Sequence, residues 1–381
     1  MNKSKQAYSR RTFMSTLTGA GTALVLKPLV SWANDELDPR VAGIVARTIG
    51  IDTHNHVDVP FATSEVPGPA IELAGEIKRS GLSAICMTFA VDRPALRNPG
   101  DAYERFNNAL ASMDRQLAQN SLKRSLNLSD LRAAHQKRQP AIIQSVEGGH
   151  FLEGKLERLD EAYSRGLRLL GLLHDNDASV PLGDIYTNPP QWGGLTAFGA
   201  DVIRACNRLG ILVDLTHASN DTINAALRVS TKPMLITHTG LDSRLGTNPT
   251  MAKMMRPRLI SKEQAKIVAD AGGVLGVWTH LADSPLEYAQ HIRALVDVVG
   301  IEHVCLGTDT KMTPTYVPGG ANQNRGRIGE RTNDAWPDQQ VGFYYAVVDA
   351  LIKAGFSEPE IGKIGSDNFC RVFDSATAGH R

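Results

Sequence analysis

Short runs of β-branched and leucine side chains recur along the chain, and stretches with helically spaced apolar positions separate them. Such runs are predicted as buried strands when turn residues bound them. Eight are found, at 46–51, 83–89, 141–146, 167–173, 211–216, 233–237, 273–278 and 303–308. Strands that alternate with helices in this number predict an α/β fold, a closed (β/α)₈ TIM barrel with its functional site at the C-terminal ends of the strands.

An open, doubly wound sheet is the alternative architecture. Such a sheet normally carries a glycine-rich phosphate-binding turn after its first strand. Here the first predicted strand runs instead into the histidine-containing sequence GIDTHNHVD at 50–58. The pattern therefore favours the barrel.

Two intervening helices are predicted at 219–228 and 261–273, each with a serine as N-cap. Two long connections rich in glycine, proline and asparagine follow strands, at 175–194 and 310–340. Loops that follow barrel strands lie over the C-terminal face. We expect these two connections to form a lid or a wall of the substrate site.

The chain has 381 residues, of which 42% are hydrophobic, and we expect one large barrel domain at 34–381. Residues 1–33 differ, with twin arginines Arg10 and Arg11, a mildly apolar stretch and a small-residue site ending at Ala33. They resemble a twin-arginine export signal, which we expect to be cleaved after Ala33. A membrane anchor is the alternative, although a lysine and a proline interrupt the apolar run.

Export predicts a periplasmic or extracellular location, with the twin-arginine translocation machinery as a partner. Removal of the signal, which has five cationic and no anionic residues, leaves 36 basic and 40 acidic residues and a net charge of −4. This balance excludes a nucleic-acid partner, and homodimerisation is left open. The four cysteines lie in apolar segments, so we expect buried free thiols.

Side chains that can bind metal follow six of the eight predicted strands. They are His54 and His56, Glu147, His174, His217, His238 and Asp309. One histidine at a strand end is more often structural, but five that converge on one barrel mouth indicate a metal site. The other six histidines, including His135, His291 and His380, are predicted to have no part in it. Imidazole and carboxylate ligands without clustered thiols favour Zn²⁺ or a similar divalent transition metal over Ca²⁺ or Mg²⁺, and there are enough for two ions.

The residues around these positions resemble those of the membrane dipeptidase (renal dipeptidase) family, zinc peptidases on a (β/α)₈ barrel. The motifs that carry the resemblance are DTHNH, SVEGG, LLHDND, GLTAFGADVIRACNRLGILVDLTHAS, ITHTG, ADAGGVLGV, LGTD and IGKIGSDNFCRVF. They extend over nearly the whole chain after the signal, and Gly194 to Ser219 is the most specific stretch.

The resemblance implies roles for individual residues. His54 and His56 would bind the first zinc ion, His217 and His238 the second, and Glu147 would bridge both ions. A hydroxide bridging the metals would attack the peptide bond of a dipeptide. The family also implies that His174 polarises the substrate carbonyl and that Asp309 passes the proton to the leaving amine.

The family also binds the free carboxylate of its substrate with an arginine. The matching residue is Arg258 or, after a small shift of alignment, Arg256. A planar guanidinium suits bidentate binding of a carboxylate. Family members accept D-residues on the C-terminal side, so peptidoglycan-derived or scavenged peptides are expected substrates.

One position departs from the family, which usually has His-x-Asp after the first strand where this chain has His54-x-His56. Asp58 shares their face but lies roughly 6.6 Å further along the strand, and Asn55 points to the other face. A neutral imidazole makes the site more positive by one unit. The substitution leaves another amide or lactone hydrolase, acting on N-acyl amino acids for example, as an alternative function, and a non-catalytic exported binding protein as a third.

Overall fold

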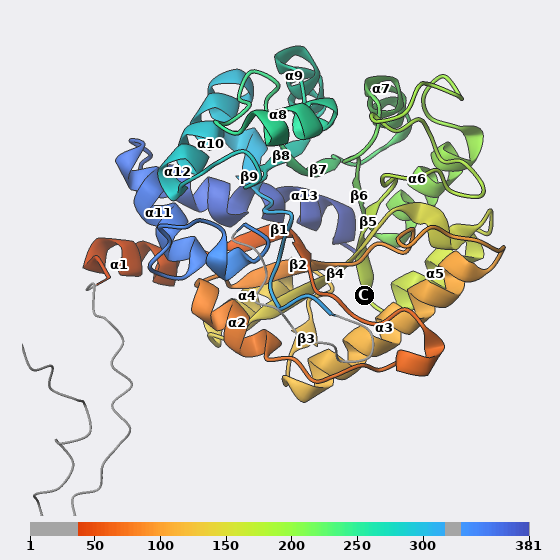
Figure 1. Ribbon diagram of the computed structural model, residues 1–381, viewed down its shortest axis with the longest axis horizontal. Helices are drawn as coiled ribbons and strands as arrows, with labels where there is room; N and C mark the ends of the chain where they lie inside the picture. Colours follow the sequence, from red (N-terminus) through yellow and green to blue (C-terminus); the bar gives the residue numbers. More distant parts are fainter. Residues whose placement is uncertain (1–36, 317–328, 381) are drawn as a thin grey trace, which may run out of the picture. The chain divides into compact units, whose positions relative to one another are not determined.

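The parallel strands of one sheet curl into a barrel with helices packed around the outside (Figure 1). The structure is a computed structural model and describes residues 37–316 and 329–380; from Asp38 onwards they belong to one compact unit, Asp38–Arg381. The strands are β1 (Ile51–His56), β2 (Ala84–Thr88), β3 (Lys123–Arg124), β4 (Ala141–Glu147), β5 (Leu167–Gly171), β6 (Leu212–Asp214), β7 (Leu235–Thr239), β8 (Val274–Val277), β9 (Val304–Leu306) and β10 (Thr310–Lys311). The helices are α1 (Pro39–Arg47), α2 (Leu73–Ser80), α3 (Asp101–Gln119), α4 (Leu128–Gln136), α5 (Glu157–Ser164), α6 (Ala197–Leu209), α7 (Asn220–Val229), α8 (Pro249–Met255), α9 (Lys262–Asp270), α10 (Pro285–Val299), α11 (Phe343–Lys353), α12 (Glu358–Gly362) and α13 (Asn368–Thr377).

The two ends of the sheet meet through β10. The strand order is β10-β1-β2-β4-β5-β6-β7-β8-β9, and β3 pairs with β4. Only three residues separate β9 from β10, and β10 pairs in parallel with β1, with Asn55 opposite Thr310. The backbone N–H of Asp309 also donates to the carbonyl of His54 at 3.1 Å. The predicted (β/α)₈ barrel is therefore confirmed.

The first strand lies later in the chain than predicted. Residues 46–51 were expected to form it, but α1 continues to Arg47 and β1 begins at Ile51. Pro39 in the first turn and the Asp38 side chain, which accepts from the N–H of Arg40, start α1. Of the predicted stretch, only Ile51 belongs to the strand, and both His54 and His56 lie within β1 itself.

The other seven predicted strands each overlap an observed one, whereas the two-residue strands β3 and β10 were not predicted. Helices α7 and α9 begin after the expected caps, since the hydroxyls of Ser219 and Ser261 accept from backbone N–H groups in the first turn. All four cysteines are buried and free, as predicted.

The end of the barrel opposite the candidate site is filled by an apolar cluster. Inward side chains from eight strands, such as Ile51, Ile143 and Leu235, pack there with Phe369 and Phe373 of α13. Because this cluster closes the N-terminal end, the polar side chains at the C-terminal end line the accessible mouth.

Parts of both long connections lie at that mouth. The 175–194 segment is held by Asp184, whose carboxylate accepts from the backbone N–H groups of Gln191 at 2.7 Å, Trp192 at 3.0 Å and Gly194 at 2.6 Å. Of the 310–340 segment, residues 317–328 lie outside the described residues, as does the predicted export signal at 1–33. Across the described parts of the chain, no helix has the length and apolar character needed to cross a membrane.

Candidate metal centre

Seven predicted site residues come together at the C-terminal mouth of the barrel. His54 and His56 project from the end of β1, Glu147 is the last residue of β4, and His238 lies in β7. His174 and His217 follow β5 and β6 by three residues, and Asp309 lies between β9 and β10. Six different strands therefore carry side chains to one site, as expected for a barrel enzyme.

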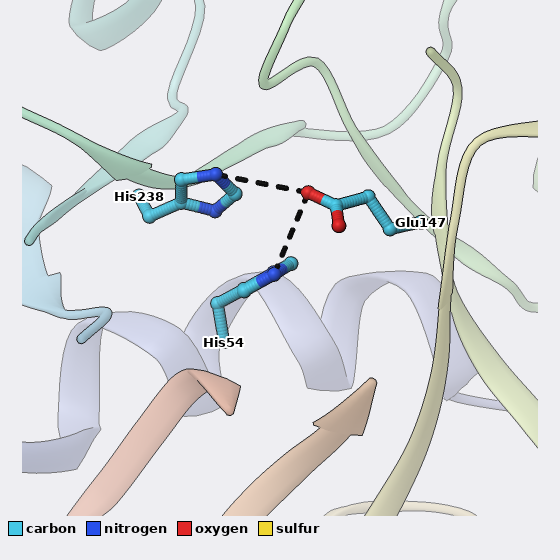
Figure 2. Close-up of side chains that lie close together, drawn as sticks. All are labelled: His54, Glu147 and His238. Atoms are coloured by element: carbon cyan, nitrogen blue, oxygen red, sulfur yellow. Dashed lines mark ion pairs between the residues drawn. The ribbon is translucent and has the colours of Figure 1, made fainter. Parts of the chain in front are cut away.

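Glu147 is the centre of this group and is 3% exposed. Its Oε1 lies 2.8 Å from Nε2 of His217, 3.5 Å from Nε2 of His54 and 3.7 Å from Nε2 of His238. Figure 2 shows the rings of His54 and His238 facing this oxygen from two sides. Its Oε2 lies 3.3 Å from Nε2 of His174 and 3.9 Å from Nε2 of His56.

The donor atoms fit divalent transition-metal ions. Three groups each have their ligand atoms within 4.8 Å of one another: His54, Glu147 and His238; His54, His56 and Asp309; and Glu147, His174 and His217. Nitrogen and carboxylate oxygen donors in small clusters are the ligands that zinc and similar ions prefer. Because Glu147 belongs to two of the groups through different partners, it can contact two ions.

The grouping differs in one respect from the family-based expectation, which pairs His238 with His217. The ring centre of His238 is 4.1 Å from that of His54 and 5.3 Å from that of His217. His174, which was expected to bind substrate, lies within the group of Glu147 and His217.

Burial and the nearby carboxylates shift the pKa values of the site histidines in opposite directions. Burial, together with the charge of neighbouring histidines, lowers the pKa of His54 to about 3 and of His238 to about 4, against the attraction of Glu147 and Asp309. For His56 burial is outweighed by the Asp309 hydrogen bond and the charge of Glu147, which raise its pKa to about 9. Hydrogen bonds to Asp175 and Glu147 likewise outweigh burial at His217 and raise its pKa to about 10.

The two carboxylates of the centre are ionised. Burial would raise the pKa of Glu147, but His174, His54 and His217 outweigh it, and the pKa falls well below its usual value. The pKa of Asp309 is also well below its usual value because nearby histidines overcome the effect of burial. The mouth therefore holds two ionised carboxylates among imidazole nitrogens, a donor set that suits a metal cation.

His174 is oriented by a buried carboxylate that the sequence did not reveal as part of the site. Its Nδ1 lies 2.6 Å from Oδ1 of Asp92, and the Asn176 side chain donates to the other Asp92 oxygen at 2.8 Å. Asp92 is 1% exposed, and its pKa is lowered because hydrogen bonding and charge from His174 exceed the effect of burial. This contact turns Nε2 of His174 towards Glu147.

His280 is a second residue that the prediction missed, since it was placed among the histidines outside the site. Its Nε2 lies 2.7 Å from Oδ2 of Asp309, and Nε2 of His56 lies 3.2 Å from Oδ1 of the same carboxylate. His280 comes two residues after the predicted strand at 273–278. The other site histidines also lie at the C-terminal ends of predicted strands. This position was the signal from which His280 could have been predicted.

Of the two arginines considered for the substrate carboxylate, Arg258 reaches the site. It lines a cavity of about 950 Å³ together with Glu147, His174 and Asp309, whereas Arg256 is exposed and is absent from that lining. One terminal nitrogen of Arg258 donates to both oxygens of Asp175, at 3.0 and 2.9 Å.

The remaining polar residues of the first motif lie as expected. The side-chain nitrogen of Asn55 donates to Asp52 at 2.8 Å and to Thr332 at 2.7 Å, away from Glu147. Asp58 accepts from Lys311 at 2.8 Å. Neither residue belongs to a candidate metal group among the described residues.

Comparisons with known proteins agree with this geometry. A family model described as "Membrane dipeptidase (Peptidase family M19)" matches residues 39–325. Dipeptidase 3 from Mus musculus is 27% identical over 241 residues, which cover 61% of this chain and 44% of that protein. The chain thus matches less than half the length of this relative.

Two solved structures have the same fold. A probable dipeptidase from Pseudomonas aeruginosa has a TM-score of 0.70 at 17% identity, covering 89% of this chain and 98% of that one. A metallo peptidase from Rhodobacter sphaeroides, liganded with a phosphinate mimic of the dipeptide L-Ala-D-Ala, has a TM-score of 0.63 at 20% identity, covering 86% and 99%.

Proposed function

Because this chain belongs to the membrane dipeptidase family of metal-dependent hydrolases, we propose that it is a zinc-dependent dipeptidase that cleaves the peptide bond of dipeptides. The observation that carries the proposal is the ring of imidazole nitrogens around the Glu147 carboxylate in the same cavity as Arg258. A cavity of about 950 Å³ is large enough for a dipeptide.

We assign the metal ligands as His54, His56, Glu147, His217 and His238, with Glu147 between two zinc ions. The clusters of donor atoms support this assignment. Zinc ions, when bound, supply Lewis acidity and generate a nucleophile from water at neutral pH. His56 stands where the family usually has an aspartate, and its Nε2 lies 3.2 Å from Nε2 of His54, on the correct face of β1.

The other residues bind and orient the substrate in this proposal. Arg258 binds the free carboxylate with the guanidinium donors that Asp175 does not use. His174, held by Asp92, presents Nε2 to the substrate carbonyl oxygen beside Glu147. Asp309, an ionised carboxylate at the mouth, accepts the proton of water and hands it to the leaving amine.

Substrate stereochemistry and location are further parts of the proposal. The Rhodobacter sphaeroides structure with a mimic of L-Ala-D-Ala supports acceptance of a D-residue on the C-terminal side. The twin arginines and the small-residue site in residues 1–33 support export through the twin-arginine machinery to the periplasm or beyond. Homodimerisation is left open.

A substrate panel tests the reaction. Purified protein with added Zn²⁺ is offered L-Ala-L-Ala, L-Ala-D-Ala, N-acetyl amino acids and lactones. We expect hydrolysis of the dipeptides. Turnover of lactones or N-acetyl amino acids alone would favour the other amidohydrolase function, and no turnover of any substrate would favour a binding protein.

Arg258 is tested with a neighbour as the matched control. Arg258→Lys keeps the charge but loses the planar fork, so we expect KM for L-Ala-D-Ala to rise about 10- to 100-fold with a smaller change in kcat. Arg256→Ala, in the same 3-10 turn, should leave both constants unchanged. A dipeptide with a C-terminal amide should be equally poor for the wild type and for Arg258→Lys. If Arg256→Ala raised KM and Arg258→Lys did not, the assignment of Arg258 to the substrate carboxylate would be contradicted.

A further inference from the structure

A buried hydroxyl lies beneath the histidines of the candidate centre. Thr237, in β7, is 0% exposed, and Asp214 at the end of β6 is 3% exposed. The Thr237 hydroxyl is 2.7 Å from Oδ2 of Asp214, 3.0 Å from Nδ1 of His238 and 3.3 Å from Nδ1 of His54. One oxygen atom therefore contacts a ring nitrogen from each of two strands.

The direction of these hydrogen bonds follows from the single proton of the hydroxyl. The carboxylate of Asp214 can only accept, and its Oδ1 already accepts from the hydroxyl of Thr216 at 2.6 Å and from the N–H groups of Thr216 and Thr237 at 2.9 Å each. The Thr237 proton therefore lies on the bond to Asp214 Oδ2. The Thr216 hydroxyl, 3.2 Å from that of Thr237, has its own proton on the shorter bond to Asp214 Oδ1. The two lone pairs of the Thr237 oxygen are therefore left for the rings, and both must donate to it from Nδ1.

The backbone holds Thr237 firmly in this place. Its carbonyl oxygen accepts from the hydroxyl of Thr53 at 2.9 Å. A Cβ atom at Gly276 or Gly307 would come within 1.9 or 1.7 Å of the same oxygen, so both glycines are required for the strands to approach so closely. The hydroxyl cannot move away without disturbing three strands.

We propose that Thr237, held by Asp214, is a positioning residue that fixes His54 and His238 in the Nδ1–H tautomer, so that both present a bare Nε2 to the metal centre. The proposal rests on the assignment of these histidines as ligands under the proposed function. With Nδ1 protonated, each neutral ring has its free lone pair on Nε2, 3.5 and 3.7 Å from Oε1 of Glu147.

The arrangement couples the two metal positions. The resemblance assigns His54 to the first ion and His238 to the second, and although both also cluster with Glu147, each ring contacts the same hydroxyl. Loss of that hydroxyl should therefore lower the affinity for both ions together. Loss of a hydrogen bond to a single ligand would lower the affinity for one ion only.

The proposal is tested by measuring the zinc affinity of the full chain, in competition with a chromophoric chelator at fixed pH. Thr237→Val keeps the shape and removes the hydroxyl, and we expect both ions to bind about 10- to 100-fold more weakly. Thr237→Ser should restore affinity to near the wild type. The control is Thr377→Val in α13, whose buried hydroxyl donates to the carbonyl of Phe373 at 2.8 Å, and it should change nothing.

Nitrogen-15 NMR of histidine-labelled, zinc-free wild type provides a readout that needs no variant to fold. His54→Gln and His238→Gln assign the signals, and we expect both rings to carry the proton on Nδ1. Nε2–H rings, or wild-type affinity for both ions in Thr237→Val, would overturn the proposal. If the wild type bound no zinc, the proposed function would fail, while the NMR spectrum would still decide the tautomers.

Discussion

His217 and Asp309 have backbone angles that residues with side chains seldom adopt, with φ of 69° and 56°. Each follows a strand at the barrel mouth. A left-handed residue there costs about 1 to 3 kcal/mol and persists where the surrounding structure imposes it. Here it turns the chain sharply after β6 and β9 so that the side chain points to Glu147 or His56.

Two histidines of the centre carry protons that zinc binding must remove. With pKa values of about 9 and about 10, His56 and His217 are protonated at pH 7 before zinc binds, and ligation must displace these protons. We expect zinc binding at pH 7 to release about two protons per chain and affinity to rise with pH. Calorimetry in two buffers of different ionisation enthalpy measures this release. A binding enthalpy independent of the buffer would contradict it.

The same shifts give the sign of the pH dependence of the free energy of unfolding without zinc. A histidine with a raised pKa, such as His56 or His217, stabilises the fold below about pH 6.5, and this contribution is lost as the pH rises through about 9 to 10. His54 and His238, with lowered pKa values of about 3 and 4, destabilise the fold as the pH falls from about 6.5 towards these values.

The site residues that lie at strand ends could be predicted from the sequence. The C-terminal ends of barrel strands converge on one mouth, and this does not depend on the conformation of the loops. Asp92, Asp175 and His280 were missed. Asp92 and Asp175 reach the site from loops, and only the fold brings Asp92 to 2.6 Å from His174 across 82 residues of chain. Which nitrogen faces which carboxylate is likewise a tertiary property.

At the scale of elements, the apolar residues before the first motif show the limit of periodicity. Val41, Ile44 and Val45 are buried at helical spacing in α1, and the chain then turns into β1 within a few residues. The pattern alone did not separate the end of the helix from the start of the strand. The predicted start of the first strand was therefore wrong, but the predicted orientation of its histidines was not affected. His54 and His56 are two residues apart and share one face of the strand wherever the strand begins.

The 175–194 segment is predicted to depend on Asp184. Asp184→Ala removes the acceptor of three backbone N–H groups and should destabilise the segment by on the order of 2 kcal/mol. Because Asp175 and Tyr186 of this segment contact His217, KM should rise. Limited proteolysis and dipeptide kinetics measure the effects.

The control for this segment is Asp177→Ala, since Asp177 is exposed in the same connection and its carboxylate accepts one exposed side-chain hydrogen bond, from Gln191 at 3.2 Å, rather than three from the backbone. It should resist proteolysis like the wild type. Equal cleavage rates for Asp184→Ala and Asp177→Ala would show that Asp184 does not order the segment.

In the whole molecule, one end of the barrel contributes to stability and the other holds the candidate site. Phe369 and Phe373 of α13 stack with ring centres 5.6 Å apart and close the N-terminal end, and the proposed metal ligands lie at the other end. Phe373→Ala should lower the free energy of unfolding by about 3 to 5 kcal/mol in a denaturant titration. Zinc content and KM should not change, and a loss of zinc from the folded variant would contradict this separation.

Under the proposed function, the mouth of this barrel is a two-zinc site for dipeptide hydrolysis. Its most direct test is the rate of L-Ala-D-Ala hydrolysis by chelator-treated protein as Zn²⁺ is added back. We predict no activity at the start and a rise to a plateau at about two ions per chain. Hydrolysis that survives the chelator, or no hydrolysis at any zinc concentration, would contradict the proposed function.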